Sequence, residues 1–144
     1  MANKNAAAKK HQNARRKRGN MLGSKKIVAF VPTTDFKKAR AFYENILGLH
    51  FVSDDGFALV FDANGIMLRI AKVQEFEPAQ FTILGWQVSD VKKAISALKA
   101  EGVKFESYGL KGQDADGVWS APGGAKVAWF KDPDGNTLSI SQHT

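Results

Sequence analysis

The sequence predicts an α+β fold in which two paired βαβββ modules curl their sheets around a central cavity. Three observations lead to this prediction. Strand and helix patterns alternate along the chain, the whole pattern occurs twice, and one module alone would leave a face of its sheet bare. Two modules can pair their bare faces around a shared concavity, and a ligand would bind there.

The first module is expected at residues 26–73. It opens with a strand at 26–32, where the residues are apolar and often β-branched. The helix that follows has Asp35 as its N-cap, apolar residues at three- and four-residue steps, and Gly48 at its C-terminus. Gly-containing turns then separate three further strands, expected at 50–53, 57–61 and 66–72.

The second module is expected at residues 81–142 and repeats this order. Asp35 and Asp90 match at an offset of 55, whereas Gly48 and Gly102 match at 54. The second helix is therefore one residue shorter than the first. The same register predicts a strand at 81–88 and a match of Phe51 with Phe105. Further along, the turn at 63–65 matches the turn at 132–135 because each precedes the final strand of its module.

Length and composition predict one cytoplasmic domain at residues 25–144. A chain of 144 residues normally forms a single domain. It has no cysteine, which excludes disulfides, iron–sulfur clusters and thiolate zinc sites. No apolar run approaches the ~20 residues that a membrane span needs, and no apolar stretch follows the basic N-terminus as in a secretory signal.

The net charge of +7 belongs to a basic tail, expected at residues 1–24. The first 20 residues hold seven Lys or Arg and no acid, while the rest of the chain has 14 basic and 14 acidic residues. The tail is too poor in apolar residues to fold alone, so it is expected to be disordered or a cloning remnant. The other interpretation is an arm that binds nucleic acid weakly.

A characteristic set of four segments spans both modules: 35–49 (DFKKARAFYENILGL), 88–91, 102–103 and 131–138 (KDPDGNTL). Together these segments resemble the vicinal oxygen chelate superfamily, which includes glyoxalases, bleomycin resistance proteins and dioxygenases. The resemblance covers the chain from residue 26 to about 142. It implies a fold of paired βαβββ modules and, for relatives of this size, a homodimer.

In catalytic members of this family, the resemblance implies a divalent metal held by His, Gln or Glu from each of four strands. The corresponding positions here are Val28, Arg69, Ile83 and Ser139. Two aliphatic side chains, one cation and one neutral hydroxyl are not a plausible ligand set. We therefore expect no metal and no other cofactor.

The predicted cavity is mostly apolar, with Arg69 as its one cation. Arg69 either pairs with an internal carboxylate, a carbonyl or water, or it binds the acidic group of a ligand. Trp119 lies in a Gly-rich loop at 108–124, which is either a lid or an ordinary connection. Trp86 and Trp129 are expected to face the core. The predicted ligand contacts are Val28, Phe30, Met67, Arg69, Ile83, Trp119 and Ser139.

These observations favour a metal-free protein that binds a small organic ligand, including acidic ones. The alternative is a glyoxalase-like lyase or isomerase, or a dioxygenase, with an unrecognised metal site; the sequence leaves open whether the chain is an enzyme. A third interpretation is a polyanion-binding protein that acts through its tail. We expect a small-molecule partner and a homodimer, no membrane, and at most weak binding of nucleic acid.

Overall fold

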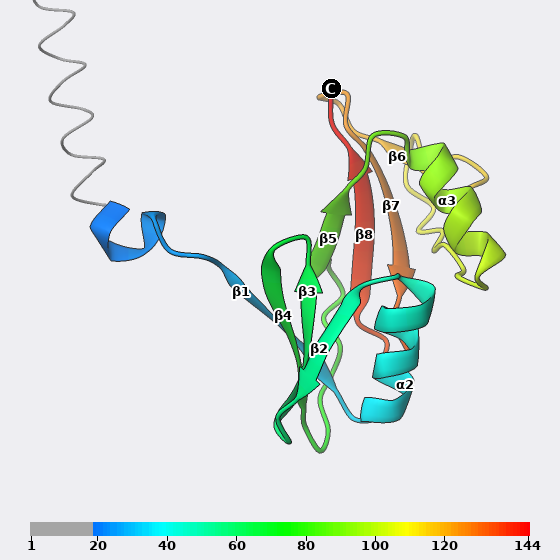
Figure 1. Cartoon of the computed structure of the whole chain (residues 1–144). Coiled ribbons are helices and arrows are strands. Elements are labelled where there is room, and N and C mark those ends of the chain that lie inside the picture. The colour runs from blue at the N-terminus through cyan, green and yellow to red at the C-terminus, as the bar shows by residue number, and fades with distance from the viewer. Residues whose placement is uncertain (1–18) are drawn as a thin grey trace, which may run out of the picture.

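The structure, a computed structural model, describes residues 19–144, with side chains from Met21 onward. The basic residues of the predicted tail lie outside the described residues, so the role of the tail stays a prediction. After a short π-helix, η1 (Gly19–Gly23), the chain forms two successive modules, each with its own four-stranded sheet (Figure 1). The predicted α+β fold of two modules is confirmed.

The first sheet has the strand order β1-β4-β3-β2. β1 runs parallel to β4, and the other neighbours are antiparallel. The helical segment between β1 and β2 covers one face of this sheet. The elements are β1 (Val28–Thr33), α2 (Phe36–Arg40), η2 (Ala41–Ile46), β2 (His50–Asp54), β3 (Ala58–Ala63) and β4 (Ile66–Lys72).

The second sheet has the order β5-β8-β7-β6, again with one parallel pair, β5 with β8. The strand predicted at 81–88 is shorter in the structure, where it begins at Leu84 and ends at Gln87. Phe81 therefore lies outside the sheet, and it is 69% exposed. The elements are β5 (Leu84–Gln87), α3 (Val91–Ala100), β6 (Trp119–Ser120), β7 (Lys126–Lys131) and β8 (Thr137–Gln142).

Both helices begin at the predicted caps. The carboxylate of Asp35 accepts a hydrogen bond from the backbone N–H of Lys38 at 3.2 Å, and Asp90 accepts from Lys93 at 3.2 Å. Each bond satisfies a backbone donor that the first helical turn leaves without a partner.

The first helix accommodates its extra residue with a π-helical turn. α2 continues directly into η2, where Leu47 N donates to the carbonyl of Phe42, five residues earlier, at 2.9 Å. A π turn holds one more residue than an α turn. Gly48 and Gly102, with φ of 74° and 92°, then end the two helices at equivalent places despite the difference in length.

The two modules also share an aromatic contact in their cores. Phe51 packs edge-on against Phe61 at 5.5 Å between ring centroids, and Phe105 packs edge-on against Phe130 at 5.6 Å. Phe105 also forms an isolated β-bridge with Phe130, where the first module has the full strand β2. The predicted match of Phe51 with Phe105 is confirmed.

A buried hydrogen-bond network, which we call the module clamp, joins the two modules. The hydroxyl of Tyr43 donates to Asp132 Oδ2 at 2.7 Å, and Asn136 Nδ2 donates to the same oxygen at 2.8 Å. Asn136 Nδ2 also donates to the carbonyl of Pro32 at 2.9 Å. Burial, together with the nearby Asp132 carboxylate, raises the pKa of Tyr43 far above its usual value.

The clamp extends to the surface through Asp134. Its Oδ1 accepts from the backbone N–H of Thr34 at 2.8 Å, and its Oδ2 accepts from the hydroxyl of Thr33 at 2.5 Å. The segment 132–136 (DPDGN) is therefore a turn that also binds the end of β1. A single apolar cluster runs through both modules beneath it. In residues 19–144, no helix is long and apolar enough to cross a membrane.

Candidate functional site

The face of the first sheet that points away from the core, its open face, carries four of the predicted ligand contacts. Val28 lies opposite Met67, and Phe30 lies opposite Arg69 on the adjacent strand. Val28, Phe30 and Met67 are 41%, 63% and 45% exposed. Their neighbours along the strands face the core instead, as side-chain alternation requires. The structure thus brings these four residues onto one surface.

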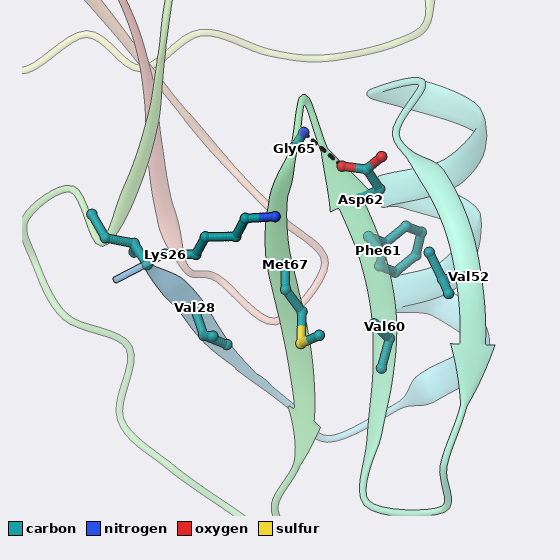
Figure 2. A pocket seen from close by; sticks show the side chains of 9 residues that line it. Lys26, Val28, Val52, Val60, Phe61, Asp62, Gly65 and Met67 are labelled. Atoms are coloured by element: carbon teal, nitrogen blue, oxygen red, sulfur yellow. Dashed lines mark hydrogen bonds between the residues drawn. The ribbon is translucent and has the colours of Figure 1, made fainter. Parts of the chain in front are cut away.

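A pocket of about 420 Å³ lies on this open face. Val28, Val52, Val60 and Met67 give it an apolar floor (Figure 2). Lys26 and Asp62 bring charge to its rim, and the Lys26 side chain points toward β4 (Figure 2). The Asp62 carboxylate is already engaged, because it accepts from the backbone N–H of Gly65 at 2.7 Å.

Sequence reasoning missed Lys26, Val52, Val60 and Asp62. Val60 could have been predicted, because side-chain alternation along β3 places it on the same face of the sheet as Arg69, its register partner. Lys26 precedes β1 by two residues, so the same alternation continued outward also points it to this face. Val52 lies at an irregularity in the β2–β3 register, which no spacing pattern predicts.

Arg69 is paired within the chain. Its Nη2 donates to Asp55 Oδ2 at 2.6 Å, and the two side chains are 25% and 40% exposed. The hydrogen bond from Arg69, with further bonds from the backbone N–H groups of Ala58 and Phe57, lowers the pKa of Asp55 to about 2. The structure thus contains the internal carboxylate partner, and a ligand contact by Arg69 stays a prediction.

The four positions that the resemblance matched to metal ligands hold side chains of other types. Val28 and Arg69 lie on the first sheet, whereas Ser139 lies on the second sheet and Ile83 immediately precedes β5. None of these side chains suits a divalent metal in this setting. Elsewhere in the described part of the chain, no group of three or more His, Cys, Asp or Glu side chains could hold one.

On the second sheet, Ser139 is buried, at 7% exposure, between Gly85 and Trp129. A side chain at Gly85 would approach Ser139 Oγ to 2.8 Å, so glycine permits this close pairing. Ile83 packs against the edge of the apolar core. Neither Ser139 nor Ile83 lines the pocket that lies on this sheet.

The prediction for Trp129 is wrong. Its neighbours Ala128 and Phe130 are fully buried in the core, so alternation turns Trp129 to the open face. There its ring centroid lies 5.5 Å from Tyr108 and 6.1 Å from Trp119. The prediction that Trp86 faces the core is confirmed, because its ring stacks on Phe130 at 6.5 Å.

A second pocket, of about 410 Å³, lies on this open face beside Trp129. Apart from Gln80, which immediately precedes it, the second module supplies this lining, and the lining of the first pocket comes from the first module alone. The predicted cavity shared by the two open faces therefore stays a prediction. Two other pockets, of about 360 and 250 Å³, are lined by residues of both modules but by none of the predicted ligand contacts. Sequence reasoning missed most of the second lining, which is Gln80, Phe81, Thr82, Tyr108, Leu110, Trp129 and Thr137.

The loop at 108–124 is tied to the rest of the second module. Lys92 of α3 binds Asp114 at 2.6 Å and Asp116 at 2.9 Å. Gln113 Nε2 donates to the carbonyls of Glu106 and Gly117, both at 3.0 Å. These contacts favour an ordinary structured connection over a lid.

The fold and the open faces define a class, that of paired βαβββ proteins with ligand-sized pockets. The family model of the Glyoxalase/Bleomycin resistance protein/Dioxygenase superfamily matches residues 26–140. The chain belongs to this superfamily, as a member whose usual metal-ligand positions hold other residues. No match was found among curated proteins.

Solved structures share the fold at low identity. Lactoylglutathione lyase from Agrobacterium tumefaciens is 18% identical with a TM-score of 0.64, over 82% of this chain and 93% of that one. A fosfomycin resistance protein from Listeria monocytogenes is 16% identical with a TM-score of 0.63, over 82% and 92%. An integron cassette protein from the Halifax Harbour sewage metagenome is 19% identical with a TM-score of 0.63, over 82% and 97%.

Proposed function

We propose that this protein binds a small organic acid in the pocket on the open face of its first module, without a metal. The observation that carries the proposal is the composition of that pocket. Val28, Met67 and Val60 form an apolar floor, and Lys26 places an ammonium group at the rim. An apolar ligand body would be removed from water there, and its acidic group would pair with Lys26.

Lys26 replaces Arg69 as the proposed anchor. Arg69 is held by Asp55 at 2.6 Å, so a ligand acid would have to compete with a carboxylate already in place. The Asp62 carboxylate accepts a hydrogen bond from Gly65 and also lines the pocket, so its negative charge would disfavour a second acidic group on the ligand. The charge pattern therefore favours a ligand with one acidic end and an apolar body.

The test is a fluorescence titration with 1-anilinonaphthalene-8-sulfonate, an apolar anionic dye. Lys26→Glu should weaken binding about tenfold, because it replaces an attraction with a repulsion at the rim. Lys25→Glu is the matched control, since Lys25 is exposed, lies outside the pocket lining and changes the net charge equally. Equal losses in both variants, or no loss in either, would refute the anchor role.

The alternative is a metal-dependent enzyme, such as a glyoxalase-like lyase or isomerase or a dioxygenase. What favours it is family membership, since the superfamily includes such enzymes. Elemental analysis after incubation with Zn, Ni, Mn and Fe salts and desalting separates the two functions. Substoichiometric metal supports the binding protein, whereas about one equivalent per chain would support the enzyme.

A second copy of the chain is part of the proposal. Phe30 and Phe81, on or beside the two open faces, are 63% and 69% exposed, and burial of such a side chain is worth about 1.5–3 kcal/mol. Homodimerisation would cover them and enclose the pockets. Sedimentation equilibrium should give twice the chain mass, and Phe30→Glu should return the protein to a monomer; a monomeric parent protein would refute this part.

The cytoplasmic location and the weak binding of nucleic acid by the tail stay predictions. For the tail, the measurement is the affinity for a polyanion such as heparin with and without residues 1–24. Equal affinity would end the polyanion hypothesis.

A further inference from the structure

The second pocket lies at the position equivalent to the first. In the first sheet, Val60 lies opposite Arg69; in the second sheet, Trp129 lies opposite Ser139. The repeat matches Arg69 with Ser139, so Trp129 stands where the first module has Val60. Both residues line their pockets, and the two volumes are nearly the same, at about 420 and 410 Å³.

The rim repeats as well. Phe81 follows Lys26 at the offset of 55 that matches the two helix caps, and both line their respective pockets. The repeated backbone therefore forms a pocket at the same place in both modules, and the side chains that line the two pockets differ. An ammonium group and a valine in the first module correspond to a phenyl ring and an indole in the second.

Aromatic rings dominate the second pocket. Trp129 is flanked by Tyr108, edge-on at 5.5 Å, and by Trp119, tilted by 34° at 6.1 Å. These contacts hold the Trp129 ring in place, while Phe81 and Tyr108 stay 69% and 46% exposed. A fixed indole beside exposed aromatic side chains is a surface on which a planar ring can stack.

The lining of this pocket carries no charged side chain. Its polar groups are the amide of Gln80 and the hydroxyls of Thr82, Tyr108 and Thr137, although the buried Thr137 hydroxyl already donates to the carbonyl of Ala79 at 3.1 Å. Partial burial, and to a lesser extent the charge of Glu106, raises the pKa of Tyr108, so its hydroxyl stays protonated and able to donate. A charged ligand would find no counter-charge in this lining, and Glu106 nearby would repel an anion.

We propose that the second pocket is a separate binding site for an uncharged planar aromatic ligand, which stacks on Trp129 and hydrogen-bonds to the surrounding neutral polar groups. The inference goes beyond the proposed function, because it concerns the other module and a ligand of different charge. Either site can fail its test without affecting the other.

The experiment uses the indole N–H signals of the three tryptophans in ¹H–¹⁵N NMR spectra of the full chain, assigned with single Trp→Phe variants. The probe is 2-naphthol, with 2-naphthoate as its anionic counterpart. The signals of Trp129 and Trp119 should shift with 2-naphthol, while Trp86, which faces the core, should not. The affinity for 2-naphthol at this site should exceed that for 2-naphthoate by about tenfold.

Two variants test the pocket itself. Trp129→Ala should weaken 2-naphthol binding by about tenfold or more. Leu110→Asp changes a side chain of the lining that is 42% exposed, and it should weaken binding without depending on the fold around Trp129. An equal or tighter affinity for 2-naphthoate, an equal shift at Trp86, or full binding by both variants would overturn the proposal.

Discussion

The last hairpin of each module, β3–β4 in the first and β7–β8 in the second, occupies an equivalent place in the repeat, but the two turns make different contacts. Among the described residues, the side-chain hydrogen bond at the turn 63–65 in the first module stays within its own hairpin, from the N–H of Gly65 to Asp62 at 2.7 Å. The turn at 132–136 in the second module reaches across to the first, with Asp132 buried beneath Tyr43. A repeat therefore preserves the backbone while its individual turns become specialised.

The two pockets likewise combine a similar backbone with different side chains. The open faces share strand order and register, yet one pocket has charges at its rim and the other has aromatic rings and neutral polar groups. Backbone similarity within this chain, and to solved relatives, thus predicts where a ligand would bind and not which ligand. The side chains on the open faces decide that.

The largest expected effect comes from the module clamp. Asp132→Ala removes the acceptor of Tyr43 and Asn136 and leaves buried donors without partners, so the free energy of unfolding should fall by about 3 kcal/mol or more. Asp62→Ala, at the start of the other hairpin, should cost about 1 kcal/mol or less, because Asp62 is exposed. Urea unfolding measures both, and equal losses would contradict the distinction between the two hairpins.

The next effect is at alkaline pH. The pKa of Tyr43 is raised in the folded protein, so above pH 10 the unfolded chain loses a proton that the folded chain keeps. Its contribution to stability is complete below pH 10 and should fall by about 1.4 kcal/mol per pH unit above it. Tyr43→Phe should be less stable at pH 8, with a gap to the parent protein that narrows by pH 11; a constant gap would contradict the shift.

The smallest effect concerns Arg69. Because Asp55 already holds it, Arg69→Met should change the affinity for the anilinonaphthalene sulfonate dye by less than about twofold. Asp55→Asn, which frees the guanidinium, should strengthen binding of the dye. If instead Arg69→Met weakened binding as much as Lys26→Glu, the anchor would be Arg69. The low pKa of Asp55 also means that this pair stabilises the fold above pH 4 and is lost toward pH 2.

How far the sequence could predict this structure depends on the range of each interaction. The caps Asp35 and Asp90, the glycines that end the helices and the face of Arg69 follow local rules of spacing and backbone geometry, and they were predictable. The partner of Arg69 lies 14 residues away across a hairpin, and no spacing rule names it.

Trp129 and the module clamp show the limit most clearly. Trp129 is large and apolar, which favours the core, but the register of β7 with β8 turns it outward. The DPDGN segment was predicted as a turn from its Pro and Gly residues. Its bond to Tyr43 spans 89 positions, so its role in joining the modules could not be inferred from turn chemistry.

The central claim is that the rim residues Lys26 and Phe81 set the charge preference of two pockets that occupy equivalent positions in the repeat. The direct test is the reciprocal exchange Lys26→Phe and Phe81→Lys, titrated with 2-naphthol and 2-naphthoate. The Met67 methyl signal reports the first pocket, and the Trp129 indole signal reports the second. We predict that Phe81→Lys makes the second pocket prefer 2-naphthoate, and that Lys26→Phe removes that preference from the first. Unchanged preferences in both variants would contradict the account.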